Sequence, residues 1–259
     1  MNDSWLRIAP SLIGASCAAG LLVSAPADAE TLMGTIMDTR TSLALSVKPT
    51  AAQHWLPRPW VVREVPKGPF KGANLIVLMI DRLLHRDAKG KPAEGGSYRR
   101  VALLIPAVDA ASKRTATFVI RVYSPQGAPG PYKNSLRASV KREAILRRND
   151  ADAGTGTERW VVAPASGGAL IFAMSYRRAV PKWMKSVIRP RSAVVPTFQR
   201  IYRYEQLIDV VKSTPPSVNR VRDVKLSVTV PELRAMFDGS ETLIGIARAP
   251  WYTRQTLLP

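Results

Sequence analysis

The fold of this chain is constrained most by short apolar runs bounded by glycine, proline or charged residues. Residues 74–80, 101–105 and 115–123 are three such runs, each rich in valine, isoleucine, leucine or aromatic side chains. Runs of this length and composition are typical of β-strands. Further strands or extended segments are predicted at residues 143–148, 160–162, 170–176, 196–203, 221–230 and 243–246.

Helical patterns are few and short. A short helix is predicted near Thr50–Trp55, and a second over Tyr204–Lys212, where Leu207, Ile208 and Val211 share one face. A third is expected to start at Pro231 and end before Asp238-Gly239. Strands do not alternate regularly with helices, so the pattern favours a β-rich α+β fold, a largely antiparallel β-barrel or sandwich with a few short helices.

Residues 30–259 are expected to form a single β-rich domain, because no linker divides them. Within it, residues 30–70 lack periodicity and hold several prolines, so we expect an irregular segment that wraps the domain. Residues 134–141 are expected to be a short helical or irregular link. The alternation in residues 221–230 predicts the longest strand, with Leu226 on its buried side, where Leu→Ala would cost about 2–5 kcal/mol if burial were complete.

The first 29 residues resemble a secretory signal. Arg7 precedes an apolar stretch over residues 8–23, and Ala27-Asp28-Ala29 matches the small-residue cleavage pattern. We therefore expect a mature chain that begins at Glu30 and is periplasmic or secreted. An uncleaved anchor and acylation at Cys17 are the alternatives, although the stretch is short for a membrane span and lacks the usual residue before the cysteine.

Composition excludes several kinds of site. The sole cysteine lies in the predicted signal, and His54 and His85 are the only histidines. A thiolate or multi-histidine metal site and a histidine-based catalytic dyad are therefore not expected, and no cofactor motif is present. The formal net charge is +19, spread along the chain without a nucleic-acid-binding motif. We expect a small anionic molecule or an anionic envelope surface as the partner, and no nucleic acid.

Three stretches resemble the acetoacetate decarboxylase-like superfamily. Residues 123–142 are similar to its strand, Gly/Pro loop and lysine-bearing active-site segment, and residues 168–174 to its following strand. Residues 220–238 are similar to its late strand and short helix. The resemblance extends over residues 70–255 and rests on the order of elements. It implies a β-barrel around an apolar cavity and a lysine that forms a Schiff base with a keto acid.

Lys141 is the first candidate for that lysine and Lys133 the second. A Schiff-base lysine needs a neutral amine, which burial and a neighbouring cation such as Arg142 would both favour. Because the free pKa is about 10.4, a neutral amine near pH 7 requires a dry cavity and not merely a basic neighbour. The sequence departs from the family's segment at Val140, where the family has proline, and at Arg142, where it has a second lysine.

Arg82, Arg142 and Glu143 are the candidate substrate-binding residues. Arg82 follows a fully apolar strand, where it could bind a carboxylate at a barrel mouth. Two hypotheses follow. The first is an exported small-molecule-binding protein of acetoacetate decarboxylase-like fold that could act as a Schiff-base lyase on a keto acid. The second is a non-catalytic basic envelope protein that binds anionic lipid or polysaccharide. The sequence does not define the oligomeric state.

Overall fold

A computed structural model describes residues 30–93, 95–148 and 154–259. The predicted signal, residues 1–29, lies outside this part of the chain. Strands dominate it, with one short α-helix, α1 (Pro49–Gln53), and one 3₁₀ helix, η1 (Pro231–Leu233). The strands are β1 (Thr31–Ser46), β2 (Trp60–Val62), β3 (Leu75–Arg86), β4 (Tyr98–Asp109), β5 (Thr115–Ser124), β6 (Ser135–Arg147), β7 (Thr155–Pro164), β8 (Leu170–Arg177), β9 (Lys182–Ile188), β10 (Arg191–Ser192), β11 (Ile201–Ser213), β12 (Val218–Asn219), β13 (Val221–Val228) and β14 (Thr242–Leu258).

The strands follow one mixed sheet path that does not close: β12-β11-β14-β1-β3-β4-β5-β6-β7-β8-β13. Three short or peripheral strands attach to it, β2 to β4, β9 to β11 and β10 to β5. Neighbours on the main path are antiparallel except β5 and β6, which pair in parallel only over Ser135–Arg137 before β6 leaves. This departure lets the sheet fold back on itself, as the β-rich fold class predicted.

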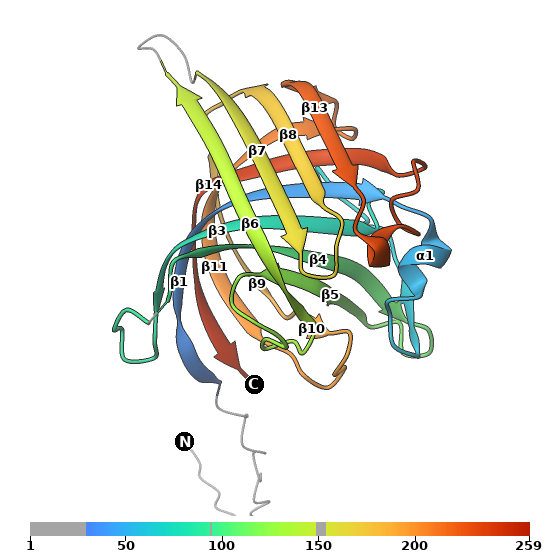
Figure 1. Cartoon of the computed structure of the whole chain (residues 1–259). Coiled ribbons are helices and arrows are strands. Elements are labelled where there is room, and N and C mark those ends of the chain that lie inside the picture. The colour runs from blue at the N-terminus through green and yellow to red at the C-terminus, as the bar shows by residue number, and fades with distance from the viewer. Residues whose placement is uncertain (1–29, 94, 149–153) are drawn as a thin grey trace, which may run out of the picture.

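Two layers enclose the main core. The group β6, β7, β8 and β13 crosses in front of β14, β1, β3, β4 and β5 (Figure 1). Trp160 and Phe172 from the first layer and Leu45, Met79 and Leu103 from the second belong to one buried apolar cluster. Burial of such side chains is the main source of stability in a β-sandwich.

The opposite face of β3, β4 and β5 is also covered. A second, smaller apolar cluster contains Ala102, Leu104 and Val119 with Tyr132 and Tyr202, the last from β11. Because these strands are buried on both faces, their sequences are nearly continuous apolar runs rather than alternating ones. We call this second face the concave face, and it holds the site described below.

The expectation for residues 30–70 was wrong over its first part. Residues 31–46 form β1, which pairs with both β14 and β3 along most of its length. Its apolar pattern is interrupted by Asp38 and Arg40, which are buried and bonded to each other. From the sequence alone, two charged residues in a strand are expected to face solvent. Here each neutralises the charge of the other, so both can be buried. The short helix predicted near Thr50–Trp55 is confirmed by α1.

The helix predicted over Tyr204–Lys212 was wrong, because these residues lie in β11 between β14 and β9. Register shifts in the β11–β14 pairing fall between Leu207 and Asp209 and between Val210 and Lys212. Each shift breaks strict alternation, so the apolar residues acquire spacing that imitates a helix. Residues 135–141, predicted as a link, likewise belong to strand β6.

The longest strand is β14 rather than residues 221–230. β13 ends at Val228, pairs only with β8, and has a register shift between Arg222 and Lys225. Leu226 is only half-buried on this edge strand, so the full core cost of Leu→Ala does not apply to it. No helix within the described ranges has the length and apolar character needed to cross a membrane.

Candidate functional site, an arginine-lined cavity

A small cavity of about 70 Å³ lies on the concave face, between β3, β4 and β5 on one side and β11 and β14 on the other. Its lining combines aliphatic side chains with four arginines and two tyrosines, and we call it the arginine cavity. It is lined by Arg40, Leu78, Ile80, Arg100, Ala102, Leu104, Val119, Val122, Pro131, Tyr132, Ser135, Ile188, Pro190, Arg200, Tyr202 and Arg254.

An adjoining hollow of about 400 Å³, the outer chamber, extends the cationic side. It shares Arg100 and Arg200 with the arginine cavity and adds Arg82 and His85 from β3. Arg82 was predicted to bind an anion at a barrel mouth, and the structure places it in this chamber. Its guanidinium lies over the Tyr98 ring, 4.6 Å from the centroid.

These arginines lack charge partners. The Nε atoms of Arg82, Arg100, Arg200 and Arg254 are buried without a hydrogen-bond acceptor, and none of the four forms a salt bridge with another described residue. Arg82 and Arg254 are only 5% and 6% exposed. Arg100 and Arg200 are partly buried. Guanidinium groups withdrawn from water are normally paired, so four unpaired ones in one region indicate a site for an anion.

Asp38 supplies only part of the missing charge, because it acts on Arg82 and Arg100 through space while it is bonded to Arg40. Its two carboxylate oxygens accept hydrogen bonds from Arg40 at 2.6 and 2.9 Å, and Arg40 stacks on Tyr252. Burial and the neighbouring Arg100 lower the pKa of Arg82 to about 9, against 12.5 for a free guanidinium. Burial and then Arg82 lower the pKa of His85, which keeps that imidazole neutral at pH 7. Burial is the larger cause of both shifts, and the neighbouring arginines add to it.

Two tyrosines share a hydrogen bond at the cavity wall. The hydroxyl oxygens of Tyr132 and Tyr202 are 2.6 Å apart, and the Arg254 guanidinium lies 3.8 Å from the Tyr202 ring centroid. Burial raises the pKa of Tyr132. Burial also opposes ionisation of Tyr202, but Arg254, Arg200 and the hydrogen bond with Tyr132 outweigh it and lower the pKa of Tyr202. Either hydroxyl can donate the hydrogen bond that joins the two tyrosines.

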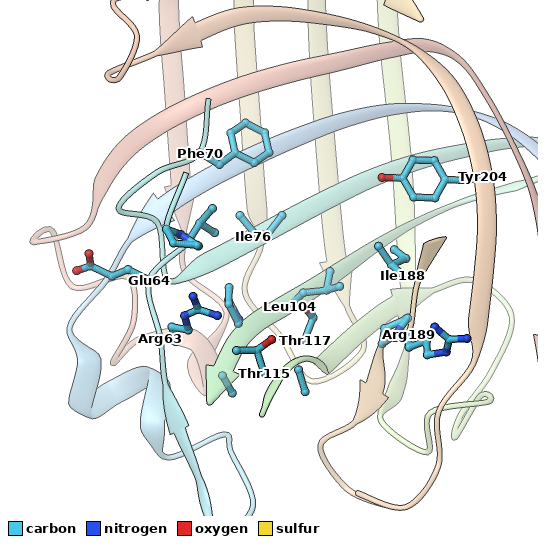
Figure 2. A pocket seen from close by; sticks show the side chains of 16 residues that line it. Arg63, Glu64, Phe70, Ile76, Leu104, Thr115, Thr117, Ile188, Arg189 and Tyr204 are labelled. Carbon is cyan, nitrogen blue, oxygen red and sulfur yellow. The ribbon is translucent and has the colours of Figure 1, made fainter. Parts of the chain in front are cut away.

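A wider cleft of about 550 Å³ opens on the same face, and we call it the lateral cleft. Figure 2 shows Ile76 and Leu104 at its base, with Ile188 and Tyr204 on one side and the segment of Arg63 and Glu64 on the other. Leu104, Ile188 and Pro190 also line the arginine cavity. The lateral cleft thus adjoins the arginine cavity, with an apolar base and charged side chains such as Arg63, Glu64 and Arg189 at its sides.

The structure does not bring the predicted lysines into these hollows. Lys141, on β6, and Lys133, in the loop before it, are both exposed. Among the described residues, no lysine lines the arginine cavity, the outer chamber or the lateral cleft. The dry environment that a neutral amine requires is absent around both side chains.

Arg142 and Glu143 are also outside the arginine cavity. Arg142 donates to Glu158 at 2.9 Å, to Asp81 at 3.0 Å and to Thr39 at 2.9 Å, between the two layers. Glu143 is exposed and lies 4.0 Å from Arg159. Arg142 is therefore held by carboxylates of the fold, while Glu143 faces solvent. Of the predicted binding residues, only Arg82 lies with the arginine cluster.

The interlayer network centres on Glu158, which is 2% exposed. Its carboxylate accepts hydrogen bonds from Thr41 on β1 and Arg248 on β14, which belong to one layer. It also accepts from Arg142 on β6 and Trp160 on β7, which belong to the other layer. Burial would raise the pKa of Glu158, but Arg248, Arg142 and these hydrogen bonds lower it. The network joins the layers, and no hollow described above includes it.

Sequence reasoning missed Arg40, Arg100, Arg200 and Arg254. A signal was present, because Arg100 alternates with Ala102 and Leu104 along one strand, which places a charge on an otherwise apolar face. Arginine inside an apolar strand is a stronger indication of a site than arginine in a basic run. Among the described residues, no group of three or more histidine, cysteine or acidic side chains could hold a metal ion.

Comparison with known proteins gives structural matches only. No family model and no curated protein matches this sequence. The chain is similar in structure to an acetoacetate decarboxylase-like enzyme from Sphingomonas wittichii RW1, with a TM-score of 0.56 and 11% identity over 88% of this chain and 91% of that one. The fold is that of the acetoacetate decarboxylase-like enzymes.

A second match has the same fold. The enduracididine biosynthesis enzyme MppR complexed with pyruvate aligns with a TM-score of 0.53 and 11% identity, over 88% of this chain and 89% of that one. The resemblance inferred from the order of elements is therefore confirmed as a shared acetoacetate decarboxylase-like fold. At this identity the comparison establishes the fold, and activity has to be argued from the arginine cavity.

Proposed function

We propose that this protein is an exported binding protein for a small anionic molecule of the keto-acid class, held in the arginine cavity. The observation that carries the proposal is a set of arginines without an ion pair, of which Arg82 and Arg254 are buried and Arg100 and Arg200 are partly buried, each with a buried Nε that has no acceptor. Arginine presents paired donors that match a carboxylate, and its attraction to an anion is strong where water is excluded. An anion would supply the counter-charge that the fold lacks.

The keto-acid class is supported by two features. The arginine cavity places aliphatic side chains beside guanidinium groups, which suits a molecule with a short carbon skeleton and a carboxylate. The structural neighbour MppR is complexed with pyruvate. The hydroxyl groups of Tyr132 and Tyr202 are bonded to each other, so the arginines are the main contacts for charge.

A more specific hypothesis is that the protein is a lyase that forms a Schiff base between a lysine and its substrate. The positions of the two candidate lysines argue against it. The chemistry requires an amine inside the binding cavity, whereas Lys141 and Lys133 are exposed. A solvated ammonium is almost fully protonated at pH 7 and is a poor nucleophile. We therefore propose non-covalent binding.

Isothermal titration with pyruvate tests both parts of this proposal. We expect saturable binding that weakens as salt is added, since salt screens the arginines. Borohydride added to the complex should leave the protein mass unchanged, because no imine is present to be reduced. A pyruvate-dependent adduct on Lys141 or Lys133 would restore the lyase hypothesis, and absence of binding to any carboxylate would remove the binding proposal.

Export is proposed from the apolar stretch and the Ala27-Asp28-Ala29 pattern. Expression in a bacterium with an export pathway should yield a periplasmic or secreted form that begins at Glu30. N-terminal sequencing of that form is the measurement, and a chain that keeps Met1 would contradict cleavage.

Binding to an anionic envelope surface is the alternative partner hypothesis, supported by the net charge of +19. It predicts salt-dependent retention on anionic vesicles or polysaccharide. A variant in the arginine cavity should leave such retention unchanged, because surface binding uses exposed charges.

A further inference from the structure

The wall of the arginine cavity changes from cationic to aliphatic along two neighbouring strands. On β3, Leu78, Ile80 and Arg82 alternate on the concave face, and on β4 Leu104, Ala102 and Arg100 do the same in the antiparallel direction. The register pairs Ile80 with Arg100 and Leu78 with Ala102. The charges therefore gather at one end of this face and the aliphatic side chains at the other.

The aliphatic surface continues beyond these two rows. The next cross-strand pair is Ile76 with Leu104, and Val119 of β5 pairs with Leu104 on its other side. Ile76 and Leu104 form the base of the lateral cleft, facing Ile188 (Figure 2). An apolar path thus runs from the arginines over Ala102 and Leu104 to a cleft of about 550 Å³.

We propose that the ligand is amphipathic, with an anionic head group at Arg100, Arg200 and Arg254 and an unbranched alkyl chain along the aliphatic path toward the lateral cleft. This inference rests on the proposed function and narrows its ligand class. A compact anion would satisfy the arginines but leave the lateral cleft empty. An alkyl chain that reaches the cleft would gain from burial against its apolar side chains.

Straight-chain carboxylates test the proposal on the full mature chain. Acetate, butanoate, hexanoate and octanoate are titrated by calorimetry at fixed salt, with hexyl phosphate to compare head groups and hexanol as an uncharged chain. We expect affinity to rise about fourfold per methylene. Hexanol should bind much more weakly than hexanoate, because it cannot pair with the arginines.

An Ile76→Trp variant locates the chain. It adds bulk at the base of the lateral cleft, outside the arginine cavity, so octanoate affinity should fall at least tenfold while acetate affinity changes by less than about threefold. Retained acetate binding shows that the variant is folded. Ile145→Trp makes the same change at an exposed position of β6 and should alter neither affinity.

Each outcome separates the two proposals. Equal affinity for acetate and octanoate would overturn the alkyl-chain proposal while leaving anion binding in place. Equal affinity for hexanol and hexanoate would also overturn it, because head and chain would then not act together. Failure of every anion to bind would remove the proposed function as well.

Discussion

Replacing Glu158 with glutamine is expected to lower the free energy of unfolding by about 3–5 kcal/mol, the range for breaking a buried ion pair on one side. Glutamine has nearly the same shape but leaves Arg142 and Arg248 without the carboxylate that now accepts from both. It also weakens the acceptors used by Thr41 and Trp160. Urea denaturation of the two proteins at pH 7 measures the difference.

The matched control is Glu143→Gln, the same change on an exposed carboxylate. Its partner Arg159 is 4.0 Å away and the Glu143 side chain is 75% exposed, so the effect should stay within about 0.5 kcal/mol. An equal effect of the two substitutions would show that Glu158 does not join the layers.

The contribution of Glu158 also has a defined pH dependence. Its pKa in the folded protein is lower than the ordinary value of 4.5, because Arg248, Arg142 and the hydrogen bonds outweigh burial. The stabilisation is therefore complete above the unfolded pKa and is lost as the pH falls through the lower, folded value. The difference between the wild-type protein and Glu158→Gln should shrink as the solution is acidified below about pH 4.

Strands could be predicted from the sequence where burial alone determines the order of apolar and polar residues. The strands of residues 75–80, 101–105 and 115–123 are apolar because both of their faces are covered. β1 could not be recognised, because the buried pair of Asp38 and Arg40 has the appearance of solvent-facing residues. β11 was mistaken for a helix because its register shifts distort the alternation.

The site was only partly predictable. Arg82 was identified because a charge directly follows an apolar strand, and it lies in the outer chamber. Arg200 and Arg254 come from segments far along the chain, so only the folding of β11 and β14 against β3 and β4 brings them to Arg100. Lys141 was selected by resemblance to a family segment, and its exposure depends on which face of β6 it occupies.

Arg100→Met is expected to weaken pyruvate binding about 100-fold, within the range for removing one member of a buried charge pair. The same substitution should make the ligand-free protein more stable. Burial lowers the pKa of Arg100, its Nε has no acceptor, and Ile80 and Ala102 are close enough to pack on methionine. A purely structural arginine would give the opposite change in stability.

Arg99→Met is the matched control, one residue away on the same strand. Arg99 faces the other side of β4, is 44% exposed and pairs with Asp81 at 3.3 Å. Its loss should change pyruvate affinity by less than about threefold and stability by less than about 1 kcal/mol, as for a surface pair. Titration calorimetry and urea denaturation of both variants measure the two effects. Loss of stability in Arg100→Met without loss of affinity would mean that the buried arginines serve the fold, and the arginine cavity would no longer be the binding site.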